Sequence, residues 1–421
     1  MRLLYSVLLY LITPLVLLRL CWRGLRQPEY RRRWGERFGH VPAPAQPVAV
    51  WVHAVSVGES LAALPLIRTL VERHGPGRVL VTTTTPTGSE RVRAALGGQV
   101  LHTYAPYDLP HVVRRFVARI RPALVVVMET ELWPNLFATL HARGVPLVIA
   151  NARLSPRSFA GYSRVRGFAT ATLAHCSHIA AQSAADEARF RQLGAPRVSV
   201  MGNIKFDLAV PLEQVKTGFG IRDSRFGKDT PVWIAASTHE GEEEIVLAAH
   251  RQIREALPEA RLILVPRHPQ RFDAVERKIV ATGLACTRRT MLTNPESPIP
   301  NPVLLGDSMG EMFMYFAAAD VAFVGGSLVP VGGHNVLEPA ALGLPVLFGP
   351  HMHNFVAARD LLLADQAALQ VGDATDLAAQ VLALLRAPEQ RARMGAAGRR
   401  AVDANRGALQ RLLAVLDAAH G

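Results

Sequence analysis

Three stretches in the first half of the sequence place charged side chains next to apolar segments. H-A-V-S-V-G-E ends at Glu59, M-E-T-E-L-W-P-N contains Glu129, and M-G-N-I-K-F-D carries Lys205. A carboxylate in the first turn of a helix is favoured in its charged form, and at the carboxyl edge of a sheet it is well placed as a general base. A lysine facing a cleft can neutralise a phosphate or carboxylate. A structural role fits equally well, because acids favour first helical turns and most lysines are solvated, so position alone leaves both interpretations open.

Two stretches of the second half carry polar side chains after apolar runs. S-T-H-E-G-E contains His239, Glu240 and Glu242, but this spacing does not match the H-E-x-x-H pattern of metal sites. We therefore expect a polar loop and a helix start there. P-R-H-P begins with Pro266 and Arg267, and the permanently charged, planar guanidinium of arginine suits a phosphate or a base.

The most distinctive pattern is glycine-rich: G-G-S-L-V-P-V-G-G-H-N-V-L-E-P at residues 325–339. It predicts a strand, a loop and a helix whose first N–H groups could bind phosphate. Asn335 suits the N-cap with Glu338 three residues later, as in a capping box, which is also the structural explanation of both residues. The glycines do not fit G-x-G-x-x-G, so a dinucleotide site is disfavoured. G-D-S-M-G-E-M, at 306–312, predicts a turn in which Gly310 lets the backbone approach a ligand.

Apolar runs that alternate with amphipathic segments must position these stretches. We expect strands at 48–52, 78–83, 100–104, 124–128 and 146–150, and again at 232–236, 261–266, 303–305, 321–324 and 346–348. Strands that alternate with helices predict parallel sheets covered on both faces. The repeat of the pattern predicts two Rossmann-like domains facing a central cleft, with ligands at the carboxyl ends of the strands.

Composition agrees with two folded domains and an anionic partner. The 421 residues are 49% hydrophobic and 19% charged, with a formal net charge of +13. The three cysteines, Cys21, Cys176 and Cys286, are widely separated, which argues against disulfides or a structural zinc site and fits a reducing compartment.

The N-terminal segment predicts a membrane anchor. Residues 3–18 carry no charge, and seven arginines follow between Arg19 and Arg37. Basic residues beside an apolar segment suit an anionic cytoplasmic leaflet. They suit nucleic acid less well, because few stacking aromatics are interleaved with them. A buried core helix remains an alternative, whereas a cleaved signal peptide is disfavoured because no small-x-small site follows.

In their order and spacing these stretches resemble the Kdo (3-deoxy-D-manno-octulosonic acid) transferases of lipopolysaccharide inner-core biosynthesis. The resemblance extends to R-R-R-W-G-E-R-F-G at 31–39, T-P-T-G-S-E-R at 85–91 and L-V-I-A-N-A-R-L-S at 147–155. It implies an α/β GT-B glycosyltransferase fold with an N-terminal hydrophobic membrane anchor. It also implies CMP-Kdo as donor and the lipid A precursor lipid IVA as acceptor, with no cofactor and no metal.

The resemblance also implies roles for individual residues. Glu59 matches the general base, and Glu129 and Lys205 match positions that stabilise the transition state. The CMP contacts correspond to Pro266, Arg267, Met309, Gly310, Glu311, Asn335, Val336, Leu337 and Glu338.

We expect an anchor at 1–22, an acceptor-binding domain at 23–206 and a linker region at 207–230. A donor-binding domain at 231–394 and a tail at 395–421, whose helix packs back on the first domain, complete the chain. The anchor places the protein on the cytoplasmic face of the inner membrane, against anionic lipid and without nucleic acid. Two alternatives stay open: a GT-B enzyme that uses a UDP-sugar, such as a lipid A disaccharide synthase or an epimerase-like relative, and a non-catalytic membrane-surface adaptor. The number of Kdo residues added and the oligomeric state are left open as well.

Overall fold

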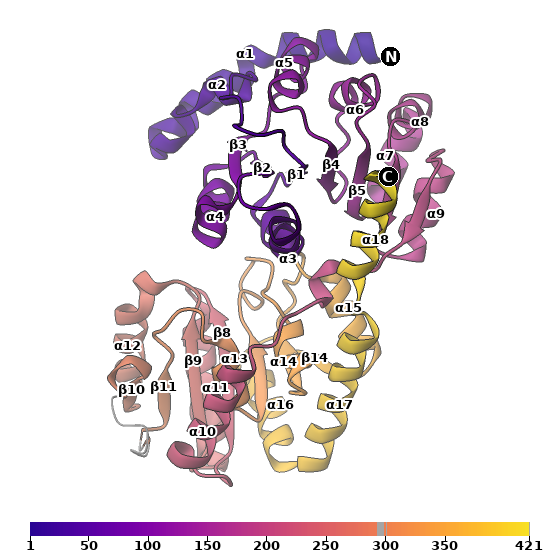
Figure 1. Cartoon of the computed structure of the whole chain (residues 1–421). Coiled ribbons are helices and arrows are strands. Elements are labelled where there is room, and N and C mark those ends of the chain that lie inside the picture. Colours follow the sequence, from indigo (N-terminus) through magenta and orange to yellow (C-terminus); the bar gives the residue numbers. More distant parts are fainter. Residues whose placement is uncertain (293–298, 300, 421) are drawn as a thin grey trace. The chain divides into compact units, whose positions relative to one another are not determined.

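The computed structural model describes residues 1–292, 299 and 301–420. The chain divides into two compact units: unit 1 is Met1–Asp207 with Arg406–Gly421, and unit 2 is Leu208–Asn405. Each unit contains one seven-stranded sheet in which every strand pairs in parallel with its neighbours (Figure 1). The alternation of strands and helices in the sequence thus produces two doubly wound α/β domains.

The sheet of unit 1 has the order β3-β2-β1-β4-β5-β6-β7. Its strands are β1 (Val50–His53), β2 (Val79–Thr83), β3 (Leu101–Tyr104), β4 (Leu124–Met128), β5 (Leu147–Ala152), β6 (His178–Ala181) and β7 (Val198–Val200). Successive side chains of a strand point to opposite faces, so Val50 and Val52 join one core while Trp51 joins the other.

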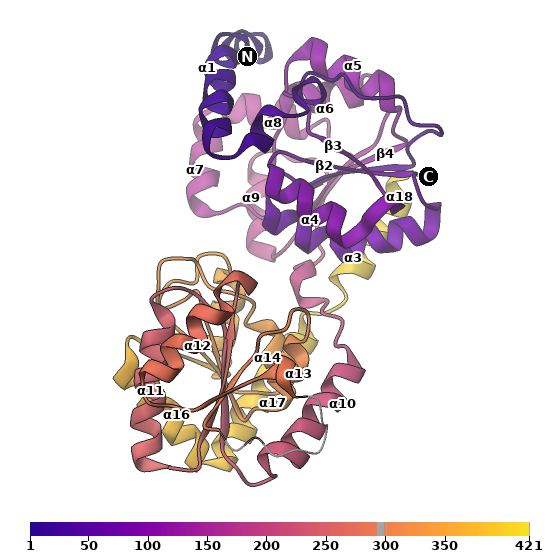
Figure 2. The same ribbon diagram turned by 90° about the vertical axis from the view of Figure 1, so that its left-hand side faces the viewer.

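Helices cover both faces of this sheet (Figure 2). One face is covered by α3 (Val57–His74), α4 (Pro86–Leu96) and α18 (Ala408–His420). The other is covered by α5 (Pro110–Ile120), α6 (Pro134–His141), α8 (Arg166–Leu173) and α9 (Ala184–Gln192). Unit 1 also contains α2 (Trp34–Arg37), α7 (Pro156–Arg164), η1 (Pro28–Arg31), η2 (Gly97–Gln99) and η3 (Ile204–Phe206).

The sheet of unit 2 has the order β10-β11-β9-β8-β12-β13-β14. Its strands are β8 (Val232–Thr238), β9 (Arg261–Pro266), β10 (Cys286–Arg288), β11 (Val303–Leu305), β12 (Val321–Val324), β13 (Val346–Phe348) and β14 (Ala368–Gln370). Its helices are α10 (Leu212–Ile221), η4 (Arg222–Phe226), α11 (Glu242–Ala256), η5 (Pro269–Arg271), α12 (Phe272–Ala281), η6 (Arg289–Met291), α13 (Met312–Ala317), α14 (Leu337–Ala341), α15 (Val356–Ala364), α16 (Ala374–Arg386) and α17 (Pro388–Ala404).

Each sheet has its topological switch point beside its first strand. In unit 1 the chain moves outward from β1 to β2 and β3, then returns to place β4 on the other side of β1. In unit 2, β8 lies between β9 and β12 in the same way. The crevice where the strand order reverses is the usual ligand site of such sheets, so the turns after β1, β4, β8 and β12 are where chemistry is expected.

Residues 207–230 differ from the expected linker, because most of them fold as α10 and η4 within unit 2. Gly218 allows α10 and α13 to pack closely, because a Cβ at this position would collide with the carbonyl oxygen of Met314 on α13. The carboxyl-terminal helix α18 belongs to unit 1, where Asp207 accepts the backbone N–H groups of Gly407 and Leu409 at the start of this helix.

The N-terminal helix α1 (Arg2–Arg26) turns polar side chains toward unit 1 and apolar ones outward. The Tyr5 hydroxyl donates to Asp108 (3.0 Å), and the Ser6 hydroxyl bonds the side chain of Asn135 at the start of α6. The exposed apolar side chains of this helix are Leu3, Leu4, Val7, Leu8, Leu11, Ile12, Leu15, Leu18, Trp22 and Leu25. Residues 2–25 are long and apolar enough to cross a membrane, with a mean hydropathy of 2.0 over the most apolar window.

Candidate active site

The turn after β1 holds Glu59 close to the backbone. Ser56 is the N-cap of α3, and its hydroxyl accepts the Glu59 N–H (3.1 Å). The Glu59 carboxylate in turn accepts the Val55 N–H (2.8 Å). The first bond satisfies an amide donor that a helix start leaves unpaired, and the second ties the Glu59 side chain to the residue before the N-cap. They fix the carboxyl group in a position where the residue is only 7% exposed.

Two further carboxylates follow β4, the neighbour of β1 across the switch point. Glu129 has a left-handed backbone (φ +57°) and donates its N–H to the carbonyl of Ala150 (2.8 Å). Such a conformation is strained for a residue other than glycine and is concentrated at functional sites. Glu131 accepts the indole N–H of Trp133 (3.0 Å), and the charges of both acids act on Glu59. The structure therefore brings Glu59 and Glu129 into one acidic site.

Burial has the largest effect on the pKa of Glu59. It raises the pKa of Glu59 to about 7, against the hydrogen bonds from Ser56 and Val55, and the negative charges of Glu129 and Glu131 raise it further. Burial and Glu129 also raise the pKa of Glu131. The sequence predicted a charged Glu59 at this helix start, whereas desolvation outweighs the hydrogen bonds of Ser56 and Val55 and raises the pKa of the carboxyl group to about 7.

Lys205 lies on η3, which packs against α3 in unit 1. Asn203 accepts the Lys205 N–H (3.0 Å), and Asn151 accepts the N–H of buried Ile204 (3.1 Å). Asn151 itself has a left-handed backbone (φ +54°) and lies where the pairing of β5 with β6 changes register. The turn that presents Lys205 is thus held by side chains from two places in the sequence.

In unit 2, the turn after β9 brings Arg267 beside the glycine-rich stretch. The Arg267 N–H donates to the carbonyl of Thr238 (3.0 Å), and Pro266 ends β9 in a buried position. Burial raises the pKa of Glu338, whereas Asn335 and the charge of Arg267 lower it. The sequence-predicted contacts Arg267, Asn335 and Glu338 therefore lie together, although roughly seventy positions separate them in the chain.

The helix after the glycine-rich loop begins later than expected. Val336, not Asn335, is the N-cap of α14, although Asn335 still accepts the Leu337 N–H (3.2 Å) and donates to Glu338 (3.0 Å). Helix α14 has only five residues, too few to build a strong macrodipole. A phosphate here would depend on Arg267 more than on the helix start that the sequence predicted as its site.

The turn after β11 contains Met309, Gly310 and Glu311. Met309 is 53% exposed, and Gly310 has φ +82°. Its carbonyl accepts the side-chain amide of Gln214 on α10 (2.8 Å), and Glu311 pairs with Arg289 (3.2 Å). Because β11 lies next to β9 in the sheet, this turn shares the ligand-binding edge with Arg267.

Known proteins match this chain over nearly its whole length. The family model described as "3-Deoxy-D-manno-octulosonic-acid transferase (kdotransferase)" matches residues 32–208. The 3-deoxy-D-manno-octulosonic acid transferase of Haemophilus influenzae is 43% identical over 99% of this chain and 98% of its own length. The chain belongs to the 3-deoxy-D-manno-octulosonic acid (Kdo) transferase family.

Two other relatives support the assignments of family and fold. The transferase of that name from Bordetella pertussis is 41% identical over 98% of both chains. The UDP-GlcNAc 2-epimerase of Neisseria meningitidis, a solved structure, covers 88% of this chain and 99% of its own with a TM-score of 0.57. At 15% identity this similarity shows the fold alone. The two α/β units of the Kdo transferase form a GT-B fold.

Glu242 has a structural role that its position in the sequence does not reveal. This fully buried carboxylate accepts backbone N–H groups from His239 (3.1 Å), Gly326 (2.6 Å), Ser327 (2.9 Å) and Leu328 (2.8 Å). Both of its oxygens are occupied by this clamp, which ties the glycine-rich loop to the turn after β8. An acid in the first turn of a helix is a common pattern, so the sequence offered no sign of the distant loop.

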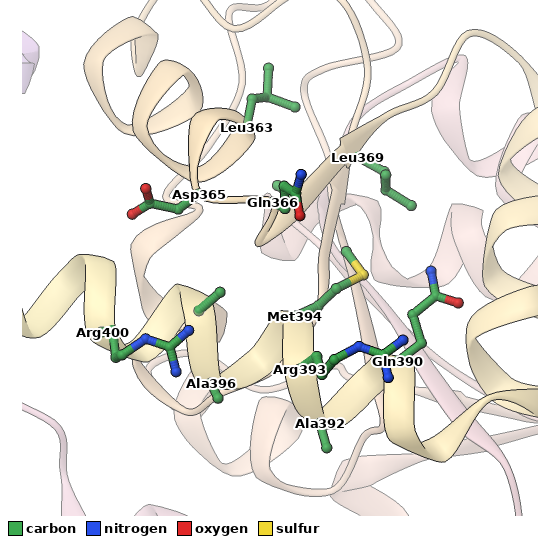
Figure 3. Close-up of a pocket in the computed structure, with 12 residues that line it drawn as sticks. Leu363, Asp365, Gln366, Leu369, Gln390, Ala392, Arg393, Met394, Ala396 and Arg400 are labelled. Carbon is green, nitrogen blue, oxygen red and sulfur yellow. The ribbon is translucent and has the colours of Figure 1, made fainter.

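A large hollow lies away from the candidate residues. It measures about 980 Å³ and lies between α15, the β14 edge strand and α17 (Figure 3). Its lining includes Leu363, Gln366, Leu369, Met394 and Arg400. Where β14 contributes to the hollow, it does so from its amino-terminal residue Ala368 onward. Ligands of such sheets bind at the opposite, carboxyl ends of the strands. None of the candidate donor contacts contributes to it in the described part of the chain.

Proposed function

We propose that this protein transfers Kdo from CMP-Kdo to lipid IVA in lipopolysaccharide core biosynthesis, with Glu59 as the general base. Family membership supports the transfer of Kdo. The observation that carries the role of Glu59 is its buried carboxyl group at the β1–β4 switch point, with a pKa of about 7. A base whose pKa lies near the working pH is both available and strong enough to take a proton.

In this mechanism the hydroxyl oxygen of the acceptor forms a bond to the anomeric carbon of Kdo, and Glu59 accepts the proton of that hydroxyl. The bond from that carbon to the cytidylate phosphate breaks, and the electron pair leaves with CMP. The strained turn of Glu129 and the η3 turn of Lys205 lie in the same unit as Glu59. We assign both to stabilising the charges that develop in the transition state.

We assign the donor to unit 2, with Pro266, Arg267, Met309–Glu311 and Asn335–Glu338 as contacts. Arg267 carries a permanent charge beside Glu338 and the glycine-rich loop, and it can offset the charge of the departing phosphate. CMP leaves with one phosphate rather than a diphosphate, so a bridging metal is not required by this proposal.

The function is tested by incubating the protein with CMP-Kdo and lipid IVA and weighing the lipid product by mass spectrometry. We expect the acceptor mass to rise by one or more Kdo units in the presence of a chelator. CMP should raise the melting temperature and UDP should not. Stabilisation by UDP without any Kdo product would instead support the UDP-sugar alternative.

The acidity of Glu59 predicts how the transfer rate depends on pH. We expect kcat/KM to rise with an apparent pKa near 7 and to fall about tenfold for each pH unit below it, because only the carboxylate form accepts a proton. The contribution of Glu59 to folding stability depends on pH in the opposite direction. The folded protein holds this proton up to about pH 7, so the group favours folding below pH 4.5 and loses that effect as pH rises toward 7. A kcat/KM that is flat from pH 5 to 8 would contradict this assignment.

We further propose that α1 lies in the membrane interface, on the cytoplasmic face of the inner membrane. Its contacts with Asp108 and Asn135 hold the polar side against unit 1, and its apolar side chains face outward. Exposed arginines adjoin this surface at Arg19, Arg23, Arg31 and Arg32, which complement anionic headgroups. Arg37 from the same sequence cluster is buried and donates to the Thr84 carbonyl, so it does not contribute to the surface.

Substitution of three outward leucines, Leu11, Leu15 and Leu18, by glutamate should abolish binding to anionic vesicles, because each buries apolar area in the acyl boundary. Co-sedimentation with phosphatidylglycerol vesicles measures the effect. The control is Leu212→Glu, an equally exposed leucine of unit 2, which should bind like the unaltered protein. Undiminished binding of the triple variant would rule out this surface.

A further inference from the structure

Two histidines from distant parts of the sequence meet in unit 2. His239 follows β8, and His334 lies in the glycine-rich stretch after β12. Their Nε2 atoms are 2.8 Å apart, and their rings are nearly parallel (7°). Because β8 and β12 flank the topological switch point of the sheet, the pair lies at the edge where ligands bind.

The surrounding loop is built around these two rings. Gly326 has φ +66°, and a Cβ there would come within 3.0 Å of His334 and 3.4 Å of His239. The same Glu242 carboxylate oxygen accepts the backbone N–H groups of His239 and Gly326. The glycine provides the space for the rings, and the buried carboxylate fixes both segments, so the pairing is part of the fold.

The environment of the pair is rich in positive charge. The ring of His268 meets that of His239 edge-on, with centroids 5.2 Å apart, and the charges of Arg267 and Arg271 act on the pair. Burial and these groups lower the pKa of His239, while Glu243, which is paired with Arg271, opposes them. Burial, Arg267 and the other two histidines lower the pKa of His334 to about 3.

Three of the negative groups near the pair are already engaged, while exposed Glu240 acts on Arg271. Glu242 is occupied by the loop amides, Glu243 by Arg271, and Glu338 by Asn335 and the charge of Arg267. Without a ligand, both histidines are therefore neutral at pH 7. The positive charges of Arg267 and Arg271, which act on the pair, favour an incoming anion at this edge.

The hydrogen bond dictates what a further proton does. In a neutral pair one ring donates Nε2–H, and the other accepts at Nε2 and carries its hydrogen on Nδ1. An added proton can enter only at the remaining free nitrogen, the Nδ1 of the first ring. Both rings then donate through Nδ1 while the Nε2–H···Nε2 bond persists.

We propose that His239 and His334 act as a proton-accepting pair that binds an anionic oxygen group of the donor and takes up one proton as that group arrives. This inference rests on the donor assignment above and extends it to two residues outside that set. The anion is either the cytidylate phosphate or the carboxylate of the sugar acid. The pair positions the donor and neutralises charge that passes to the leaving phosphate when the glycosidic bond breaks.

Calorimetry of CMP binding in buffers of different ionisation enthalpy counts the protons exchanged. If the cytidylate phosphate is the bound anion, we expect the full-length protein to take up close to one proton per CMP at pH 7 and fewer toward pH 6. The phosphate, with a pKa of about 6, would itself release protons on entering a positive site, so uptake has the opposite sign. The Glu59→Gln variant should show the same uptake, which separates the pair from the titrating carboxyl group of unit 1.

Glutamine in place of either histidine keeps hydrogen bonding but cannot take up a proton. His239→Gln and His334→Gln should each abolish the uptake and weaken CMP binding about tenfold, and the double variant should add little because the two act as a unit. His268→Gln, outside the hydrogen bond, is the matched control and should retain the uptake.

The arms of the experiment separate the two anions. Uptake with CMP but not with cytidine identifies the phosphate. Normal CMP binding together with a raised KM for CMP-Kdo in both glutamine variants identifies the carboxylate. If both glutamine variants keep the proton exchange and the donor KM of the unaltered protein, the proposed role of the histidine pair is wrong. Loss of proton uptake in His268→Gln would also contradict it. Absence of CMP binding in the unaltered protein would instead count against the donor assignment.

Discussion

Replacement of Glu59 by glutamine should lower kcat for Kdo transfer by about 10²- to 10⁴-fold, the usual range for loss of a general base. Glutamine has nearly the same size, and its carbonyl oxygen can still accept the Val55 N–H now bound by the carboxylate. The fold and donor affinity should therefore stay intact while the proton acceptor is lost. Transfer assays with CMP-Kdo and lipid acceptor, together with CMP calorimetry, measure the two quantities separately.

The control for this variant is Glu72→Gln on the same helix. Glu72 is exposed, so its substitution should leave kcat unchanged. Stability provides a second check, because removing a buried group that can carry charge should make Glu59→Gln at least as stable as the unaltered protein above pH 7. Normal turnover by Glu59→Gln would remove this residue from the catalytic role.

The second large effect is expected at Glu242, whose two oxygens accept four backbone N–H groups. Glutamine would direct its own NH₂ group at two of these donors and leave them unsatisfied. Each buried unsatisfied group costs about 1–3 kcal/mol, so the glycine-rich loop should detach from the turn after β8. We expect Glu242→Gln to weaken CMP binding more than 100-fold, corresponding to about 3 kcal/mol.

Urea unfolding and CMP calorimetry separate loop displacement from global unfolding. A displaced loop lowers CMP affinity while the protein still unfolds cooperatively at a measurable urea concentration. Glu240→Gln is the matched control, because Glu240 lies two residues away and is exposed. Unchanged CMP affinity in Glu242→Gln would show that the clamp does not support the donor site.

Much of the architecture follows from the sequence, because the periodicity of apolar residues is a local property. The ten expected strands correspond to β1–β5, β8, β9 and β11–β13, with ends that differ by at most two residues. The strands β6, β7, β10 and β14 were missed: β7, β10 and β14 are edge strands, and β6 lies next to β7. Edge strands are buried less and so carry a weaker apolar pattern.

The folded segment at 207–230 shows the limit of composition as a guide. Its glycines and lysines suggested a linker, yet Gly218 allows α10 to pack against α13 and Gln214 supports the turn at Gly310. The basic cluster after α1 is a second case, because Arg33 pairs with Glu36 and Arg37 is buried. Whether a charged or small residue serves packing or solvent depends on neighbours that are distant in the sequence.

The sequence by itself determined the alternation of strands and helices, the apolar N-terminal segment and the turn that carries Glu59. Backbone preferences and residue spacing act over a few positions, and these features need nothing more. Only the tertiary structure decided that Glu59 titrates near neutrality, that Glu242 clamps a loop 84 residues away and that His239 meets His334 across 95 residues. Desolvation and hydrogen bonding depend on which segments the folded sheet brings together, and that arrangement is set by the whole chain.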